Sequence, residues 1–429
     1  MSTKLEKVAE KARSDHRLRF TSLAHLLSPA FLKETWSQLN KRGAHGVDGQ
    51  TVKEFEDGLD ERVQDLHARL KAGQYRAPPV RRVNIPKGQG KTRPLGIPTV
   101  EDRLVQAAVA RILNAVYEPV FMDSSFGYRP KRSAHDALRQ VRSHLIGDKV
   151  MHVYDMDIKS YFERVNHKWL RRMLSERIAD PVILRLIDKW LRAGVMDDGV
   201  VVRREDGVPQ GGPVSPILAN VYLHYVLDLW FEHKVKPHCR GEAHLVRFAD
   251  DAVAMFQYGS DAERFGRALK GRTEKFSLEL SPEKTRQLLF GRFARERLAE
   301  TGQRPETFEF LGFKHVCGVD RQGRFAVVRI PSQKSCRKFL DRVRQWLRAH
   351  MHWKVRYQQR KLSQMLNGFY QYFALPHCCP KLCGIHATVM RQWRTTLRRR
   401  SQRSKTHWSY LKQQHWFKLP TPVSLHSTV

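Results

Sequence analysis

A pair of adjacent aspartates, Asp250 and Asp251, interrupts an apolar stretch with the sequence HLVRFADDAVAMFQY. The residues on both sides are rich in β-branched and aromatic side chains, which favour strands. Burying a carboxylate is costly unless a cation or a hydrogen-bond donor compensates it. The stretch is therefore predicted to form two strands joined by a turn, which presents the two carboxylates at one edge of a sheet.

A second predicted strand, KVMHVYDMDI, also carries acids, with Asp155 and Asp157 on the same strand face. Two strand ends that present carboxylates at a common edge bind hard divalent cations through oxygen, and Mg²⁺ is the natural ion where phosphates supply the remaining ligands. The alternative is that these acids only cap strand ends, as an isolated Asp-Asp pair commonly does.

Strands and helices alternate in a way that predicts an α+β domain with an antiparallel sheet. The segment PPVRRVNIPKGQGKTRPLGIP predicts a hairpin with a basic, glycine-rich tip. A helix is expected from Val100 to about Tyr117, with Thr99 as its N-cap. Between 30 and 72, a first helix is expected before a GVDG turn at 46–49, and a second helix that runs through Phe55 and Leu70 after it. Further helices are expected at 168–193 and in VYLHYVLDLWFEHKV after the PQGGPVSP stretch, and a third strand-like piece at 307–316.

Positive charge is the dominant feature of the composition. The chain has 429 residues, 77 Lys and Arg against 43 Asp and Glu, and a net charge of +34. Its 41% of hydrophobic residues exclude a disordered basic tail, so a folded protein that binds a polyanion is expected, and nucleic acid is the commonest one. A membrane surface is the weaker alternative.

The charge is concentrated in the last quarter of the chain. Residues 333–429 hold 20 Lys and Arg and a single acid, Asp341, and their apolar spacing is helical throughout. We expect two domains, a mixed domain at 1–332 and a basic helical domain at 333–429. Aromatic rings interleaved with the basic residues suit RNA binding, although about half of these rings are expected to form the core of the helical domain.

Neither a long apolar run nor a signal peptide is visible, so a cytoplasmic protein without membrane contact is expected.

The six cysteines form no regular framework and are expected to be reduced thiols. A zinc site in the cluster from His377 to His386 is disfavoured, because adjacent cysteines at 378 and 379 suit tetrahedral chelation poorly.

Seven blocks resemble, in order, the reverse transcriptases of group II introns: PKGQGKTRPLGIP, SSFGYRPKRSAHDAL, DMDIKSYFERVNH, GVPQGGPVSPILANVYL, RFADDAVAMF, LSPEKT and FEFLGF. The resemblance covers roughly residues 30–330, and the following helical region resembles the thumb and maturase domain of that family. It implies a right-hand polymerase with fingers, palm and thumb. The implied activity is RNA-directed DNA synthesis, with intron RNA binding, splicing assistance and a role in intron mobility.

The resemblance also implies a catalytic centre. Asp157, Asp250 and Asp251 match the family's metal-binding acids, which would hold two Mg²⁺ ions while the primer 3′-hydroxyl attacks the α-phosphate of a dNTP. Asp155 lies on the same strand face, but the metal-binding role is assigned to Asp157, because Asp157 directly precedes the IKSYF run that matches the family. Lys284 matches a lysine that would protonate the leaving pyrophosphate, although a surface lysine is an equally good interpretation.

The resemblance also implies which residues bind the nucleotide. Lys87 and Arg93 match basic residues that contact the triphosphate, Gln210 matches a nucleotide-contacting position, and Phe162 matches the bulky residue that excludes a 2′-hydroxyl. The alternatives are a solvated basic turn for the hairpin and a core position for Phe162. The LGF sequence at 311–313 resembles the element that grips the primer end, or is a buried strand.

The chain departs from the family pattern at three positions: Phe248 stands where Tyr is usual, Ser160 where Gly is frequent and Glu163 where Asp is frequent. No zinc-associated endonuclease pattern follows the maturase-like region, so no endonuclease domain is expected.

The expected partners are structured intron RNA, an RNA template, a DNA primer or target, and dNTPs. Two alternatives remain, an RNA-binding splicing factor with a vestigial polymerase and a reverse transcriptase recruited by its host for defence or repair.

Overall fold

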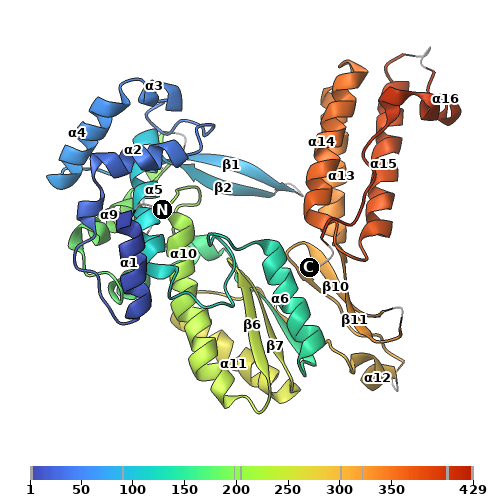
Figure 1. Cartoon of the computed structure of the whole chain (residues 1–429), viewed down its shortest axis with the longest axis horizontal. Coiled ribbons are helices and arrows are strands. Elements are labelled where there is room, and N and C mark those ends of the chain that lie inside the picture. Colours follow the sequence, from blue (N-terminus) through green and yellow to red (C-terminus); the bar gives the residue numbers. More distant parts are fainter. Residues whose placement is uncertain are drawn as a thin grey trace.

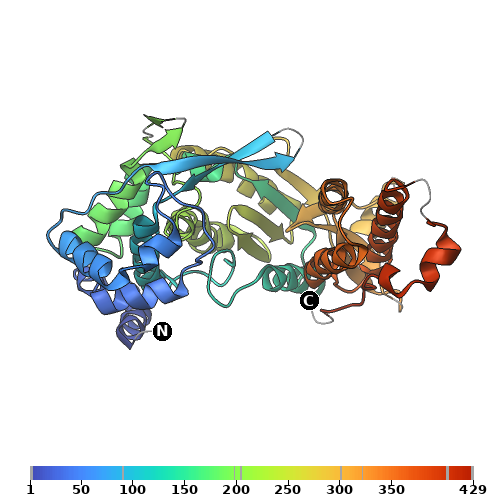
Figure 2. The same ribbon diagram turned by 90° about the horizontal axis from the view of Figure 1, so that it is seen from above.

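The computed structural model describes residues 3–88, 91–197, 199–202, 205–299, 302–320, 322–401 and 405–426. Figures 1 and 2 show an elongated molecule with N-terminal helices at one end, sheets in the middle and C-terminal helices at the other end. Within these ranges the strands form three sheets, with the orders β2-β1-β4-β5, β6-β7-β3-β8 and β11-β10-β9.

The N-terminal helices pack around α5, whose bounds match the predicted helix. Thr99 caps α5 by accepting a hydrogen bond from the Asp102 amide at 3.2 Å. The helix predicted to run through Phe55 and Leu70 is divided in the structure, because Gly58 adopts a left-handed conformation with φ of 79°. The helices of this part are α1 (Thr3–Ser14), α2 (Pro29–Gln38), α3 (Val52–Glu56), α4 (Leu59–Lys71) and α5 (Val100–Tyr117).

The predicted hairpin is present as β1 (Val80–Gly88) and β2 (Lys91–Ile97), which pair antiparallel from Arg81–Ile97 to Gly88–Lys91. β4 (Val195–Asp197) joins β1 in parallel and β5 (Val200–Val202) completes the sheet.

The central sheet is antiparallel throughout, as expected for an α+β domain. It consists of β6 (Ala243–Phe248), β7 (Asp251–Phe256), β3 (His152–Asp157) and β8 (Arg286–Leu289). Apolar side chains of α6 (Ala134–Gly147) pack on one face and those of α11 (Gly259–Lys275) on the other. Both faces of the sheet therefore pack against helices, which position the strands.

The helices that connect the strands of this sheet include one irregularity that was not predicted. α10 (Ser215–Leu223) continues into π-helical segments at His224–Asp228 and Phe231–Val235. The expected helices between 168 and 193 are present as α8 and α9. The remaining helices are α7 (Tyr161–Arg164), α8 (His167–Ser175), α9 (Pro181–Arg192) and α12 (Ala294–Ala299).

The strand-like piece predicted at 307–316 is a hairpin and not a single strand. Leu311 and Gly312, with φ of 50° and 79°, form a tight turn between β9 (Phe308–Phe310) and β10 (Phe313–Val319). The third strand of this sheet is β11 (Phe325–Pro331), which pairs with β10.

The rest of the described chain is helical, in agreement with the apolar spacing. Its helices are α13 (Gln333–Ala349), α14 (Val355–Phe373), α15 (Cys379–Arg398) and α16 (Trp408–Gln413). The β1–β2 hairpin projects from the N-terminal helices toward α13 and α14 (Figure 1). Among the described helices, none combines the length and the apolar character needed to cross a bilayer.

Candidate active site

The three predicted metal-binding acids lie at one end of the central sheet. Asp157 is the last residue of β3 and Asp251 the first of β7, and the strand register places the two directly opposite each other. Asp250 stands beside Asp251 in the turn that follows β6. The turn is tight because Ala249 adopts a left-handed conformation with φ of 57°. Carboxylates of neighbouring strands that are 94 residues apart in sequence, Asp157 and Asp251, are thus brought to one edge of the sheet.

The surroundings of Asp251 show that negative charge is concentrated here. Burial, followed by the charges of Asp250 and Asp157, raises its pKa to about 6, while Lys284 and Lys334 act in the opposite direction. Carboxylate oxygens are the donors that Mg²⁺ prefers, and a divalent cation relieves the mutual repulsion of such a group. Protein atoms crowd the Asp251 carboxylate, but part of the residue is still exposed to solvent, so an ion can reach it.

Lys284 lies against one of the acids. Its Nζ is 3.0 Å and 2.9 Å from the two carboxylate oxygens of Asp157. Among the described His, Cys, Asp and Glu side chains, one group of three brings its ligand atoms within 4.8 Å of one another, and the three aspartates are not that group. Both carboxylate oxygens of Asp157 therefore accept from Lys284.

Asp155 differs from Asp157 in its environment. It lies two residues further back on β3, opposite Val253 and Arg286 of the neighbouring strands. Burial raises its pKa to about 7, with Arg286 opposing the shift and Asp251 adding to it. Asp155 therefore lies inside the sheet and not at its edge.

A buried ion pair supports the turn that carries the acids. Arg247 and Asp228 are both fully buried and form two hydrogen bonds of 2.7 Å and 2.6 Å with each other. The Arg247 guanidinium also donates to the backbone oxygen of Ala249 at 2.9 Å, to Asn220 at 3.1 Å and to Ser125 at 2.7 Å. Arg247 therefore ties the turn to the π-helical segment below it. Sequence reasoning missed this pair, because partners 19 residues apart carry no local signal.

Two predicted nucleotide-binding residues contact each other across 117 residues of sequence. The Arg93 Nε donates to the Gln210 side-chain oxygen at 2.5 Å, and the amide of Gly96 donates to the Gln210 backbone oxygen at 2.6 Å. Gly211 permits this approach, because a Cβ there would lie 2.4 Å from the Gly96 oxygen. The PQGGP turn is thus docked on the hairpin strand β2.

Phe162 is almost fully buried, with 5% of its surface exposed, and lies at the wall of a pocket that Gln210 and Gly96 also line. It packs edge-on against Tyr128 at 6.4 Å between ring centroids. Ser160, just before α7, has a left-handed φ of 49°, which explains why glycine suits this position. Lys87 lies on β1, but its side chain is outside the described part of the structure.

Tyr128 is a site residue that sequence reasoning did not single out. It follows Gly127, which packs so closely on the Asp-Asp turn that a Cβ added to this glycine would lie 2.2 Å from the Ala249 nitrogen. Burial and the nearby Asp250 raise the pKa of Tyr128, while Arg93 lowers it. The half-exposed ring therefore lies between the acids and the arginine of the hairpin. The SSFGYRP block was the signal that could have identified it.

The LGF turn joins the C-terminal helices to this site. The Tyr372 hydroxyl of α14 donates to the Leu311 backbone oxygen at 2.9 Å, and its ring lies 5.6 Å from that of Phe313. Burial raises the pKa of Tyr372 to about 12, and the charge of Asp251 contributes to the shift. Leu311 and Gly312 are at the turn, whereas Phe313 is fully buried in β10.

The aromatic residues of the basic helices divide into buried and exposed rings. Trp393 is completely buried and donates to the Gln358 side-chain oxygen at 2.9 Å. Trp353 and Tyr357 are 52% and 58% exposed. In the cysteine cluster, Cys378 is buried whereas Cys379 and Cys383 are exposed.

Comparisons with known proteins place these features in a family. Residues 85–315 match the family described as "Reverse transcriptase (RNA-dependent DNA polymerase)". Protein YkfC of Escherichia coli is 33% identical over 375 residues, which cover 82% of this chain and 96% of that protein. Group II intron-encoded protein LtrA of Lactococcus lactis is 36% identical over 235 residues, 54% of this chain and 39% of LtrA. Nuclear intron maturase 2 of Arabidopsis thaliana is 26% identical over 174 residues, 32% of this chain and 24% of that protein.

Proposed function

Because the chain belongs to the reverse transcriptase family, and within it to the group II intron-encoded proteins, we propose that its aspartate cluster performs two-metal DNA synthesis on an RNA template. The chain is an RNA-directed DNA polymerase. The observation that carries the proposal is the register that sets Asp157 opposite Asp251, with Asp250 next to it.

The three carboxylates are assigned to two Mg²⁺ ions. When bound, these ions supply activation of the primer 3′-hydroxyl and neutralisation of the charge on the transferred phosphate. Arg247 keeps the turn with Asp250 in place through its bond to the Ala249 oxygen. Lys284 holds a proton next to Asp157, and we assign it the protonation of the leaving pyrophosphate.

The incoming dNTP is assigned to the region beside the three aspartates, between β2 and α7. Arg93 and Lys87 bind its phosphates, and Gln210 orients the Arg93 guanidinium as well as contacting the nucleotide. Phe162 closes the sugar side of the pocket and rejects a 2′-hydroxyl by steric exclusion. The bond between Arg93 and Gln210 supports this arrangement, because it fixes the hairpin strand relative to the PQGGP turn.

We assign the N-terminal helices and the β1–β2 hairpin to the fingers, the central sheet to the palm, and residues 333–429 to the thumb and maturase domain. The basic helices of this last domain bind structured intron RNA and the template–primer duplex through phosphate contacts. Assistance of splicing and copying of the intron RNA during mobility follow from this binding combined with polymerase activity.

Primer extension tests the proposal. Purified protein is expected to extend a DNA primer on an RNA template with dNTPs and Mg²⁺, and Asp250→Asn is expected to abolish extension. Asp60→Asn, in an exposed ion pair on α4, is the matched control and should extend as the wild type does. Undiminished extension by a folded Asp250→Asn protein, as judged by circular dichroism, would contradict the assignment.

A further inference from the structure

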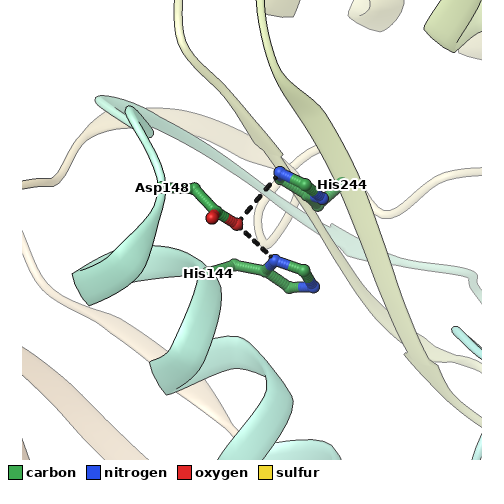
Figure 3. Close-up of side chains that lie close together, drawn as sticks. All are labelled: His144, Asp148 and His244. Atoms are coloured by element: carbon green, nitrogen blue, oxygen red, sulfur yellow. Dashed lines mark hydrogen bonds and ion pairs between the residues drawn. The ribbon is translucent and has the colours of Figure 1, made fainter.

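A cluster of two histidines and one aspartate lies on the central sheet, away from the aspartates described above. His144 and Asp148 come from the C-terminal end of α6 and His244 from β6 (Figure 3). Among the residues that the structure describes, this is the one group of three potential ligands whose donor atoms all lie within 4.8 Å of one another. We propose that His144, Asp148 and His244 form a Zn²⁺ site that ties α6 to the central sheet.

The three donor atoms converge. One carboxylate oxygen of Asp148 lies 2.6 Å from the His144 Nδ1 and 3.1 Å from the His244 Nε2. The two imidazole rings are stacked at 3.9 Å, with both of these nitrogens directed toward Asp148 (Figure 3). Two imidazole nitrogens and one carboxylate oxygen on the same side form three of the four ligands of a tetrahedral ion.

The His244 ring has an unsatisfied nitrogen. Its Nε2 is buried and has no hydrogen-bond partner among the described residues, although it lies within ion-pair distance of Asp148. The distance is short but the geometry is not that of a hydrogen bond, and a buried polar atom without a partner is unfavourable. A metal ion bound between the two rings and the carboxylate satisfies this nitrogen directly.

The donor set selects the ion. Imidazole nitrogen suits Zn²⁺ and related transition metals, whereas Mg²⁺ prefers oxygen ligands, so the site is distinct in chemistry from the aspartate cluster. Glu242 is not assigned as a ligand, because it does not belong to the group whose donor atoms lie within 4.8 Å of one another. The three side chains are 20–35% exposed, so a water molecule can take the fourth position.

The site lies between the C-terminal end of α6 and strand β6, so a bound ion stabilises the packing of this helix on the sheet. His244 pairs with Met255 on β7, four residues along the strand from Asp251, which corresponds to about 13 Å. At its other end α6 carries His135, whose Nε2 contacts the Tyr372 backbone oxygen at 2.8 Å. The ion therefore holds the C-terminal end of the helix whose N-terminal end contacts α14.

Metal content and thermal unfolding of the full chain test the site. Each protein is freed of metal, incubated with Zn²⁺, dialysed, and analysed for bound zinc and for the midpoint of thermal unfolding. The wild type is expected to retain one more Zn²⁺ per chain than His244→Gln, and Zn²⁺ is expected to raise its midpoint by about 3–5 °C. His16→Gln, an exposed histidine outside the cluster, is the control and should match the wild type. Equal zinc content and equal shifts in wild type and His244→Gln would overturn the proposal.

A second variant and a spectroscopic measurement keep the test decisive if His244→Gln folds poorly. Co²⁺ in place of Zn²⁺ is expected to give visible absorption without a thiolate charge-transfer band, and Asp148→Asn is expected to remove it. A thiolate band that survives in Asp148→Asn would assign the ion to the exposed Cys379 and Cys383 and contradict the site. The Asp250→Asn protein should retain the cobalt spectrum, which separates this result from that of the polymerase assay.

Discussion

The Lys284 ammonium donates hydrogen bonds to both carboxylate oxygens of Asp157, with its Nζ 2.9 Å and 3.0 Å from them. An ammonium on these oxygens competes with a metal ion for them. We therefore expect Lys284→Met to reach half-maximal extension at a lower Mg²⁺ concentration than the wild type. If Lys284 also protonates the pyrophosphate, the rate at saturating Mg²⁺ falls by about 10²-fold or more.

Single-nucleotide incorporation over a range of Mg²⁺ concentrations separates these two effects. Lys284→Arg keeps the positive charge, so its Mg²⁺ dependence should stay closer to that of the wild type. An unchanged Mg²⁺ requirement in Lys284→Met would show that the ammonium does not compete for the site.

The raised pKa of Asp251 predicts how the stability of the metal-free protein depends on pH. Between its ordinary value of 3.8 and about 6, the folded state binds this proton more tightly than the unfolded state. The free energy of unfolding therefore falls as pH rises through this window, and Asp251→Asn makes the fall smaller. Urea unfolding with EDTA at pH 4–7 measures it. Equal pH dependence in both proteins would contradict the crowding of carboxylates at the site.

The buried pair of Arg247 and Asp228 predicts a large loss of stability. Arg247→Met leaves Asp228 as a buried charge without its partner, which costs about 3–5 kcal/mol. Lys33→Met, in a solvent-exposed ion pair with Asp60, is the control and should change stability by less than about 1 kcal/mol. Chemical denaturation compares the two variants. Similar small effects in both would show that the turn does not depend on this pair.

Exposed and buried rings of the basic helices predict opposite phenotypes. Trp353→Ala removes an exposed stacking surface, so it should weaken binding of structured RNA by about 1–3 kcal/mol with little change in stability. Trp393→Ala opens a cavity in the core and should destabilise the protein by about 3–5 kcal/mol. Fluorescence anisotropy with labelled RNA and denaturant unfolding measure the two quantities. Unchanged RNA binding in Trp353→Ala would place the RNA elsewhere.

The features that could be predicted from the sequence are those determined over short distances. The strand-turn-strand unit around Asp250, the N-cap at Thr99 and the helical spacing after residue 333 each depend on neighbouring residues. The LGF hairpin was missed because Leu311 has a positive φ, which is uncommon for a leucine and gives no turn signal.

The contacts that complete the site could not be predicted, because they join residues far apart in the chain. Arg93 and Gln210 were each singled out, but their hydrogen bond depends on how the hairpin packs on the PQGGP turn. His144 and Asp148 are four residues apart at the end of one helix, but His244 lies on a separate strand, so the group of three has no signal in the sequence. Only the folded chain brings these residues together.

The central claim is that Asp157, at the edge of the sheet, holds metal for nucleotidyl transfer and that Asp155, two residues away on the same strand, does not. The rate of single-dNTP incorporation on an RNA template tests it with a matched pair of variants. We expect Asp157→Asn to lower the rate by about 10³-fold or more and Asp155→Asn to stay within about tenfold of the wild type. Equal losses in the two variants, or a larger loss in Asp155→Asn, would contradict the account.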